Sequence, residues 1–365
     1  MPRTRGGNPT IADVARESGV GAMTVSRVVN GGKLVSAATA ARVRAAIKKL
    51  GYEPNEAARI LKGHAARTIA LIVPDLADPF FSICAHAAQQ VAARHGYLTL
   101  LLASERDRES ESRELAMMKS RNIAGILIVP SSSASLGQLC ELRERGVPVV
   151  MLDRTFPGLD AGEVMVENRE GARNAVNHLL DHGHRRILCV GYDCEFNSIR
   201  QRMEGYECAM REAGLRPRFA MVKEGAQVAS QLLKQLRSSA PPTALFTLNN
   251  VTTIQVLSAL KREDVSLPGQ VAIIGFDDFE LAPLLAVPLT AVRQPAAELG
   301  RSAARLLLDW AQSHPAGMRW ARTRIVLPTE LVIRRSCGCE AIRKISPDGK
   351  RPPTSQRAAG VTRQN

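Results

Sequence analysis

The sequence predicts an α/β protein in which a small all-α head precedes a larger region of doubly wound parallel sheets in two lobes. Two observations support this fold class. Over residues 10–50 the apolar residues recur at helical spacing. From Ala66 onward, continuous apolar runs typical of strands buried on both faces alternate with helical patterns. The length of 365 residues allows two or three domains with a sizeable core.

The head begins with two short helices on either side of a glycine. Thr10 is placed to cap the first helix, with Asp13 as the acidic partner of a capping box, and Gly19 is placed to end it. In the second helix the valines face inward. Its outward side carries Ala22, Met23, Ser26 and Arg27. This helix-turn-helix pattern suits a DNA major groove, and two small core helices of an ordinary domain are the alternative.

A third helix and the distribution of charge favour the DNA-binding interpretation. The third helix is predicted from Ser36 to Leu50, before Gly51, and three such helices close a small core. Residues 1–63 hold 11 Lys and Arg against 4 Asp and Glu, and residues 341–365 hold 6 against 1. The remaining residues are nearly balanced, at 32 against 30. A basic head on a balanced body predicts a polyanionic partner for the head.

Seven apolar runs predict strands that are separated by helices. They are Thr68–Val73, Leu98–Leu102, Gly125–Val129, Val147–Leu152, Ile187–Gly191, Ala244–Leu248 and Val271–Phe276. The first and the fifth run open two similar passes of strands and helices, which predicts two lobes of related topology. Ligands of open α/β sheets bind beyond the carboxyl ends of strands, so a cleft between the lobes is the expected pocket.

An ordered set of residues in the head carries a family resemblance. It comprises Thr10–Ala15, Gly19-Val20, Thr24–Asn30, Val35-Ser36, Gly51-Tyr52-x-Pro54-Asn55, Ala58-Arg59 and Leu61-Lys62. This set resembles the lactose/galactose-repressor family of bacterial transcription regulators. The resemblance implies four parts, which are a helix-turn-helix DNA-binding domain at 8–53, a hinge helix and linker at 54–65, a two-lobed, periplasmic-binding-protein-like effector and dimerisation domain at 66–336, and a basic tail at 337–365. The prolines and charges of the tail predict disorder.

The resemblance also implies how the head contacts DNA. Arg27 can donate twice to a guanine edge, while Ala22 and Met23 make apolar contacts, such as those to thymine methyl groups. The hinge helix would insert Leu61 as a wedge into the minor groove, or Leu61 only packs the linker. The full expected set is Thr10, Ala22, Met23, Thr24, Ser26, Arg27, Asn30, Ala58, Leu61 and Lys62. Thr24, Ser26 and Asn30 are expected to contact phosphates or to be structural. Gly21 departs from the family, which commonly has a capping Ser there.

Three residues near predicted strand ends suit a small ligand. Phe80 follows the first strand and can form an aromatic wall against a sugar or base ring, while Phe81 serves equally well in the core. Asp153 and Asp277 each come directly after a strand, where carboxylates can accept hydrogen bonds from ligand hydroxyls. A loop cap or a salt bridge between the lobes is the alternative for both.

The resemblance adds two residues to the expected effector site. The family usually directs an arginine that matches Arg202 into its pocket, and Asn249 corresponds to a ligand contact. Asn250 stands where many members have Asp, which removes a charge from the site. The expected effector-binding set is Phe80, Asp153, Arg202, Asn249 and Asp277.

Neither a metal site nor a cofactor is predicted. The seven cysteines are scattered and odd in number, which favours reduced thiols over a disulfide framework. The pair Cys337 and Cys339 lacks a paired His or a second Cys motif with metal-ligand spacing. The resemblance offers another account of the pair, because family members often end in a similar Ser-Cys-Gly-Cys run. His178 and His182 lie one helical turn apart, and we interpret them as helix-end residues that interact with the helix dipole rather than as ligands.

Two other functional classes fit the sequence less well than a regulator does. An enzyme acting on a sugar is not supported, because the sequence has no Gly-rich phosphate loop, no Gly-x-Ser-x-Gly elbow and no His-Glu-x-x-His helix. A solute-binding receptor without a DNA role is disfavoured by the basic head and by the lack of an apolar signal segment. No apolar run reaches the length of a membrane span. We therefore expect a cytoplasmic protein, associated with the nucleoid when it binds DNA.

The combined interpretation is a sequence-specific, DNA-binding transcriptional repressor. The resemblance implies a homodimer, and since protein symmetry is mirrored in the site, the double-stranded operator would be pseudo-palindromic. The resemblance also implies a small-molecule effector, a sugar or sugar acid, that binds between the lobes and controls the operator affinity. No catalytic residue, cofactor or membrane partner is expected.

Overall fold

The structure is a computed structural model that describes residues 9–29, 35–53, 66–156, 158–192, 196–222, 227–313, 320 and 322–339. The chain divides into two compact units, Met1–Arg67 and Thr68–Asn365. Each unit has its own hydrophobic core.

The first unit contains the three helices that the sequence predicts. They are α1 (Ile11–Ser18), α2 (Ala22–Val29) and α3 (Ala37–Leu50). Their core is built on Val14, Val25 and Val43, one from each helix and all fully buried. The inward-facing valine pattern of the second helix is thereby confirmed.

The ends of these helices follow from their capping residues. The Thr10 hydroxyl accepts a hydrogen bond from the backbone N–H of Asp13, and the Asp13 carboxylate accepts one from the backbone N–H of Thr10. Gly19 ends α1 with a φ of 65°, and Gly51 ends α3 with a φ of 62°, a region that glycine enters without strain. Ser36 caps α3. The predicted capping box is confirmed.

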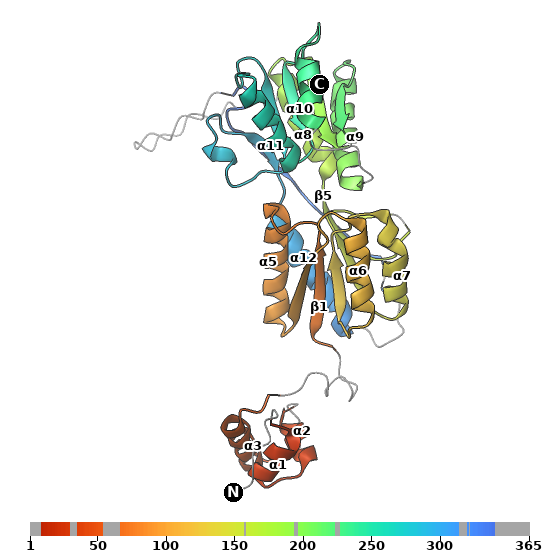
Figure 1. Cartoon of the computed structure of the whole chain (residues 1–365), viewed down its shortest axis with the longest axis vertical. Coiled ribbons are helices and arrows are strands. Elements are labelled where there is room, and N and C mark those ends of the chain that lie inside the picture. The colour runs from red at the N-terminus through yellow and green to blue at the C-terminus, as the bar shows by residue number, and fades with distance from the viewer. Residues whose placement is uncertain are drawn as a thin grey trace, which may run out of the picture. The chain divides into compact units, whose positions relative to one another are not determined.

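The second unit consists of two lobes, and the first is built on a six-stranded parallel sheet with the order β11-β5-β4-β3-β1-β2. Its strands are β1 (Thr68–Val73), β2 (Leu98–Ala103), β3 (Gly125–Ile128), β4 (Val149–Leu152), β5 (Gly162–Val166) and β11 (Arg324–Leu327). Its helices are α5 (Pro79–Arg94), α6 (Arg108–Lys119), the short η1 (Ser133–Ser135), α7 (Leu136–Glu144) and α12 (Ala296–Ser313). Helices α5 and α12 pack on one face of the sheet, and α6 and α7 pack on the other (Figure 1).

The second lobe repeats this plan with the strand order β12-β10-β9-β8-β6-β7. Its strands are β6 (Ile187–Tyr192), β7 (Phe219–Val222), β8 (Ala244–Thr247), β9 (Ala272–Phe276), β10 (Thr290–Arg293) and β12 (Glu330–Val332), of which only β12 is antiparallel to its neighbour. Its helices are α8 (Asn168–Asp181), α9 (Asn197–Glu212), α10 (Gln227–Leu236), α11 (Asn250–Arg262) and the short η2 (Ala282–Leu284). Helices α8 and α9 cover one face, and α10 and α11 cover the other.

Burial on both faces explains why the strands are apolar throughout. In β1, Ile69 and Leu71 face the core under α5 and α12, whereas Ala70 and Ile72 face the core under α6 and α7. All seven predicted strands are present, with ends that differ by up to two residues. Strands β5, β7, β10, β11 and β12 were not predicted.

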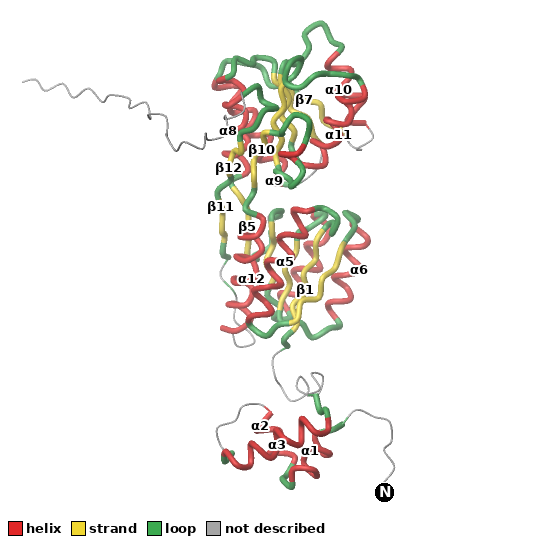
Figure 2. Tube along the Cα trace, turned by 90° about the vertical axis from the view of Figure 1, so that its left-hand side faces the viewer, coloured by secondary structure: helices red, strands yellow, loops and turns green. Residues whose placement is uncertain are grey.

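The chain crosses between the lobes three times. The crossings run from β5 to α8, from β10 to α12 and from β11 to β12. Figure 2 shows β5 and β11 side by side on one edge of the first lobe, with β12 in the second. The two lobes therefore do not correspond to two continuous halves of the sequence. The segments α12 and β11 follow the second-lobe strands in the chain but belong to the first lobe.

One glycine in each lobe allows two helices to pack closely. A Cβ atom on Gly300 of α12 would lie 2.1 Å from the carbonyl oxygen of Cys84 in α5. A Cβ atom on Gly205 of α9 would lie 2.1 Å from the carbonyl oxygen of Arg169 in α8. Both helix pairs thus require glycine at the contact.

Candidate DNA-binding and effector sites

The outward face of α2 presents a small set of side chains to solvent. Ala22, Met23 and Arg27 are exposed, and Met23 reaches 70% exposure. An Arg27 Nη lies 3.9 Å from the Met23 sulfur, one helical turn away. Thr24 and Ser26 are half-buried beside this face. A helix that exposes a large apolar side chain next to an arginine has the composition expected of a base-reading surface.

Thr10 is also expected to contact DNA, and it lies at the start of α1 rather than on α2. The Thr10 hydroxyl and backbone N–H both donate to the Asp13 carboxylate, so its donors are used in capping α1. Asn30, Ala58, Leu61 and Lys62 lie outside the described residues, as does the expected hinge helix.

In the second unit, a cavity of about 420 Å³ lies between the two lobes. Its lining includes all five expected effector-site residues: Phe80 and Asp153 from the first lobe, and Arg202, Asn249 and Asp277 from the second. The carboxyl ends of strands from both lobes meet here, as expected of a doubly wound fold.

Arg202 of α9 makes three hydrogen bonds with its side chain at this cavity. Its Nε donates to Asn168 Oδ1 at 2.8 Å, and its Nη1 donates to the Leu248 carbonyl oxygen at 2.8 Å and to Asp277 Oδ2 at 3.2 Å. The guanidinium carbon lies 3.8 Å from the centroid of the Phe276 ring. With 3% exposure and these partners, Arg202 fixes the position of Asp277.

The two strand-end aspartates share an unusual backbone conformation. Asp153 follows β4 with a φ of 62°, and Asp277 follows β9 with a φ of 74°. This left-handed region is sparsely populated except by glycine, Asn and Asp, so it turns both carboxylates toward the cavity at a small conformational cost.

Two oxygens of the cavity lining are buried without a hydrogen-bond partner among the described residues. They are Oδ1 of Asp153 and Oε1 of Gln294. The Nε2 of Gln294 donates to Asp277 Oδ1, which fixes the orientation of the amide because a carboxylate only accepts. Burial raises the pKa of the Asp153 carboxyl, and the nearby Arg202 and Arg154 guanidinium groups offset this only in part. Both oxygens are therefore acceptors that require a donor from a ligand or water.

The cavity lining also contains Arg154, which packs against phenylalanine rings. The guanidinium carbon of Arg154 lies 3.9 Å from the ring centroid of Phe196 and 5.5 Å from that of Phe81. Phe80 and Phe81 meet edge to face at 5.2 Å. Phe81 is buried in the core and Phe80 is half-buried, and both rings line the cavity.

Asn249 and Asn250 have different roles at the start of α11. The Asn249 side-chain oxygen accepts from the backbone N–H of Thr252 at 2.8 Å and so caps the helix. The Asn250 Nδ2 donates to Asp78 Oδ1 in the other lobe at 3.0 Å. The residue that departs from the family pattern thus makes a direct bond between the lobes.

Several lining residues were not predicted. Gln294 follows β10 directly, so the strand-end rule would have found it if this strand had been recognised. Arg154 comes directly after Asp153, and Phe196 precedes α9. Tyr192 ends β6, and a strand-end tyrosine carries the same signal as a strand-end aspartate.

A three-helix head with an exposed reading face and a two-lobed unit with a polar cavity define a ligand-responsive DNA-binding regulator. The profile of bacterial regulatory proteins of the lacI family matches residues 10–55, and that of the periplasmic binding protein-like domain matches residues 176–337. The chain belongs to the lacI family of bacterial regulatory proteins and is a DNA-binding transcriptional regulator. This membership confirms the resemblance and disfavours a solute receptor without a DNA role.

Relatives match nearly the whole chain. The chain is 32% identical over 337 residues to the transcriptional regulator DegA of Bacillus subtilis, which covers 90% of this chain and 97% of DegA. It is 34% identical over 331 residues to the transcriptional repressor CytR of Escherichia coli, which covers 90% of this chain and 96% of CytR.

Solved structures show the same fold. A complex of the transcriptional regulator CelR with cellobiose matches 90% of this chain and 99% of its own, with a TM-score of 0.65 and 30% identity. A lac repressor dimer bound to operator and an anti-inducer matches 91% of this chain and 99% of its own, with a TM-score of 0.78 and 24% identity. Of the helices that the structure describes, none combines the length and apolarity of a membrane span.

Proposed function

We propose that this regulator is a homodimeric repressor that binds a pseudo-palindromic operator. Its affinity for the operator would fall or rise when a sugar occupies the cavity between the lobes. Its site of action would be the cytoplasm, at the nucleoid when bound to the operator. The relatives are transcriptional regulators, and we assign no catalytic role to the cavity. Its carboxylates are held by arginines and by Gln294 rather than paired with each other as an acid and a base.

The observation that carries the ligand class is the pair of unpartnered acceptors, Asp153 Oδ1 and Gln294 Oε1. Buried acceptors favour a ligand rich in donors, and vicinal hydroxyls supply several donors in a small volume. The aromatic ring of Phe80 adds a wall on which a sugar ring can pack. Cellobiose in the CelR complex, and ribose in a lacI-family regulator from Enterococcus faecium, support a sugar here.

The charges of the lining favour an uncharged sugar over a sugar acid. Three carboxylates face the cavity, and each has an arginine within 4 Å. The pairs are Asp78 with Arg106 at 3.2 Å, Asp153 with Arg154 at 3.8 Å and Asp277 with Arg202 at 3.2 Å. An anionic ligand would need a cation that is not already paired, and the lining offers equal numbers of both charges.

For the head, we propose that Arg27 reads a guanine and that Ala22 and Met23 contact bases, on the basis of their exposure on α2. Thr24 and Ser26 would contact phosphates beside them. The roles of Thr10, Asn30, Ala58, Leu61 and Lys62 remain those implied by the family. The division into 8–53, 54–65, 66–336 and 337–365 remains a proposal, with the addition that packed structure continues to Cys339.

Exposed apolar side chains support a second copy of this chain as the partner. The first lobe exposes Leu98 (70%) and Leu101 (42%) on β2, Ile83 (46%) on α5 and Leu76 (42%). The second lobe exposes Ile254, Leu281 and Leu284. Patches on both lobes allow one two-fold interface to run along the second unit of each copy.

The proposal is tested on the full chain with a fluorescent duplex selected from random DNA by the protein itself. We expect a symmetric consensus, binding that weakens steeply with salt, and an affinity that changes when a neutral mono- or disaccharide is added. The corresponding sugar acids should act at least tenfold less strongly. Binding without sequence preference, or an effector response confined to sugar acids, would contradict the respective part of the proposal.

A further inference from the structure

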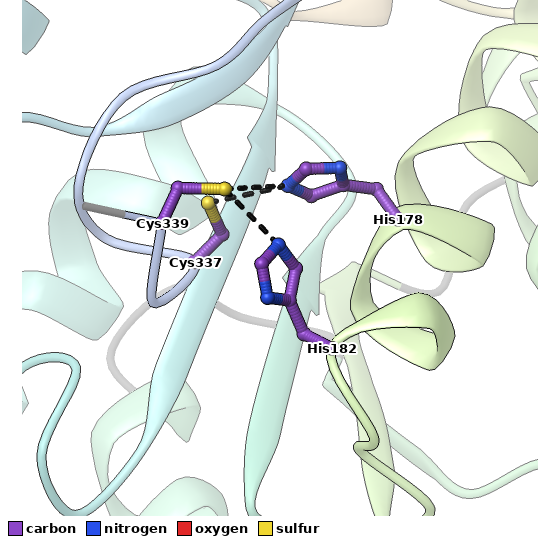
Figure 3. A group of neighbouring side chains, drawn as sticks. All are labelled: His178, His182, Cys337 and Cys339. Carbon is purple, nitrogen blue, oxygen red and sulfur yellow. Dashed lines mark hydrogen bonds between the residues drawn. The ribbon is translucent and has the colours of Figure 1, made fainter. Parts of the chain in front are cut away.

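Four side chains with metal-binding atoms converge in the second lobe, and none of them lines the effector cavity. His178 and His182 come from the end of α8, and Cys337 and Cys339 come from the turn after β12 (Figure 3). The His178 Nε2 lies 3.3 Å from the Cys337 sulfur and 3.4 Å from the Cys339 sulfur, and the His182 Nε2 lies 3.0 Å from the Cys339 sulfur. All four ligand atoms lie within 4.8 Å of one another.

The local sequence places each pair on one side. His178 and His182 are four residues apart and therefore lie on the same face of α8, where their rings meet edge to face at 4.7 Å. Gly338 adopts a φ of 96°, which reverses the chain so that Cys337 and Cys339 both point at α8.

The turn that carries the cysteines is held firmly. The Ser336 hydroxyl donates to the Ile273 carbonyl oxygen at 2.7 Å and accepts from the Thr290 N–H at 2.8 Å. Cys337 itself is fully buried. The two thiols are therefore positioned by the sheet, and the two imidazoles by the helix.

The spacing of the four atoms suits a tetrahedral ion. Zinc–sulfur bonds near 2.3 Å and zinc–nitrogen bonds near 2.0–2.1 Å at tetrahedral angles require separations of about 3.4 Å between nitrogens, about 3.6 Å between nitrogen and sulfur and about 3.8 Å between sulfurs. The three measured nitrogen–sulfur separations fall 0.2 to 0.6 Å below this value. Small rotations of the side chains would open them to accept an ion.

Hydrogen bonds alone do not account for the convergence. A neutral imidazole nitrogen either donates once or accepts once, yet His178 Nε2 faces both sulfurs, at 3.3 and 3.4 Å. A central cation would use one lone pair from each of the four atoms. The Thr290 hydroxyl also donates to the Cys337 sulfur at 3.2 Å, as groups behind metal-bound thiolates commonly do.

We propose that His178, His182, Cys337 and Cys339 form a Cys₂His₂ site for Zn²⁺, or for another soft divalent ion of tetrahedral preference. Four protein ligands leave no open position, so the site is structural rather than catalytic. Binding would release the thiol protons and link α8 to the segment that ends the described chain. The site is independent of the proposed DNA and sugar functions, and it replaces the sequence-based expectation of no metal.

The test uses the full chain, purified with a reductant, stripped with a chelator and titrated with Co²⁺ and then with Zn²⁺. We expect one metal per chain, the visible absorption of tetrahedral Co²⁺ with a thiolate-to-metal charge-transfer band, and loss of both when Zn²⁺ displaces Co²⁺. Since loss of a group behind the ligands lowers affinity by about 10- to 100-fold, H182A and C339S should each lower it by more than 100-fold.

Matched variants control for folding and for adventitious binding. His182 is exposed, so H182A leaves the core unchanged, while H86A and C140S remove a histidine and a cysteine outside the cluster and should bind metal as the wild type does. Zinc should raise the unfolding temperature of the wild type and of both controls, but not that of H182A or C339S. Octahedral Co²⁺ spectra, zinc that persists in both ligand variants, or a mass two units lower from a Cys337–Cys339 disulfide in the reduced protein would each overturn the proposal.

Discussion

Replacing Asp153 with Asn is expected to weaken sugar binding and to stabilise the second unit, because both effects arise from one buried oxygen. Asp153 Oδ1 is buried without a partner among the described residues, and burial raises the pKa of this carboxyl. Asn has the same shape and tolerates the left-handed φ of 62°. D153N therefore removes a charge and leaves the backbone in place.

The two magnitudes follow from the contacts. An unpartnered buried polar atom costs about 1–3 kcal/mol, and the cost is larger when the atom is charged. Asn keeps an oxygen in the same space but removes the charge, so it recovers only part of this cost. The free energy of unfolding should therefore rise by about 1 kcal/mol at pH 7. A hydrogen bond to a charged group contributes about 1.5–3 kcal/mol and one to a neutral group about 0.5–1.5 kcal/mol, so exchanging the carboxylate oxygen for an amide oxygen should lower the sugar affinity by about 5- to 13-fold.

The stability difference should depend on pH. The pKa of Asp153 in the folded protein is above its ordinary value of 3.8, so the folded state holds this proton more tightly than the unfolded chain does. As the pH rises from 3.8 through the folded pKa, the wild type loses stability relative to D153N, and above that pKa the difference is constant. Below a pH of about 3.8 the two proteins should be equally stable.

Intrinsic fluorescence measures this unit selectively. Both tryptophans of the chain, Trp310 and Trp320, lie in the core of the first lobe, so urea unfolding followed by their emission does not report on the head. Titration calorimetry gives the sugar affinity, and D160N, at an exposed carboxylate of the same lobe, is the control. A D153N protein that is less stable than the wild type at pH 7, or that binds sugar with unchanged affinity, would refute the reasoning.

Three further substitutions test the other contacts. R27A should cost about 1–3 kcal/mol at the selected operator and relax the base preference at one position, and an equal loss on random DNA in anisotropy competition would refute base reading. R202M leaves Asp277 buried without its cation and should destabilise the second unit by about 3–5 kcal/mol in urea unfolding; a loss below 1 kcal/mol would contradict this. G300A places a Cβ atom 2.1 Å from the Cys84 carbonyl and should destabilise by about 1–3 kcal/mol, whereas G137A, with nothing within 4 Å, should be neutral or stabilising.

Local features of the fold were predictable because their causes are local. Thr10, Gly19 and Gly51 act within one helical turn, and the capping box formed as their spacing predicts. The central strands were equally clear, because burial on both faces makes a strand such as β1 apolar throughout.

Three of the five missed strands, β7, β11 and β12, lie at sheet edges, where these signals are weak. β7 and β11 are four-residue edge strands with one half-exposed side, and β12 has three residues. Their places in the sheets depend on pairing across long sequence separations, such as β11 with β5, which no short window reveals. The three crossings between the lobes were missed for the same reason.

The candidate sites show the same division. Phe80, Asp153 and Asp277 were found because parallel strands place their carboxyl ends at one edge. The Cys₂His₂ cluster was not found, because His182 and Cys337 are 155 residues apart. Only the antiparallel addition of β12 to β10 carries the cysteine turn back onto α8.

The bonds between the lobes indicate how a ligand can control this protein. Asn250 donates to Asp78, and Asn197 exchanges two hydrogen bonds with Thr155, at 2.8 to 3.0 Å. At about 0.5–1.5 kcal/mol each, these three bonds favour the arrangement with the lobes in contact, here called closed, by about 1.5–4.5 kcal/mol. This is less than the 5.5 kcal/mol or so that shifts a two-state equilibrium from about 1:99 to about 99:1. An Asp at position 250, as in many family members, would place two carboxylates face to face and favour opening. Because Asn250 already joins the lobes in this chain, a sugar that satisfies Asp153 and Gln294 needs to add only a modest preference for closure.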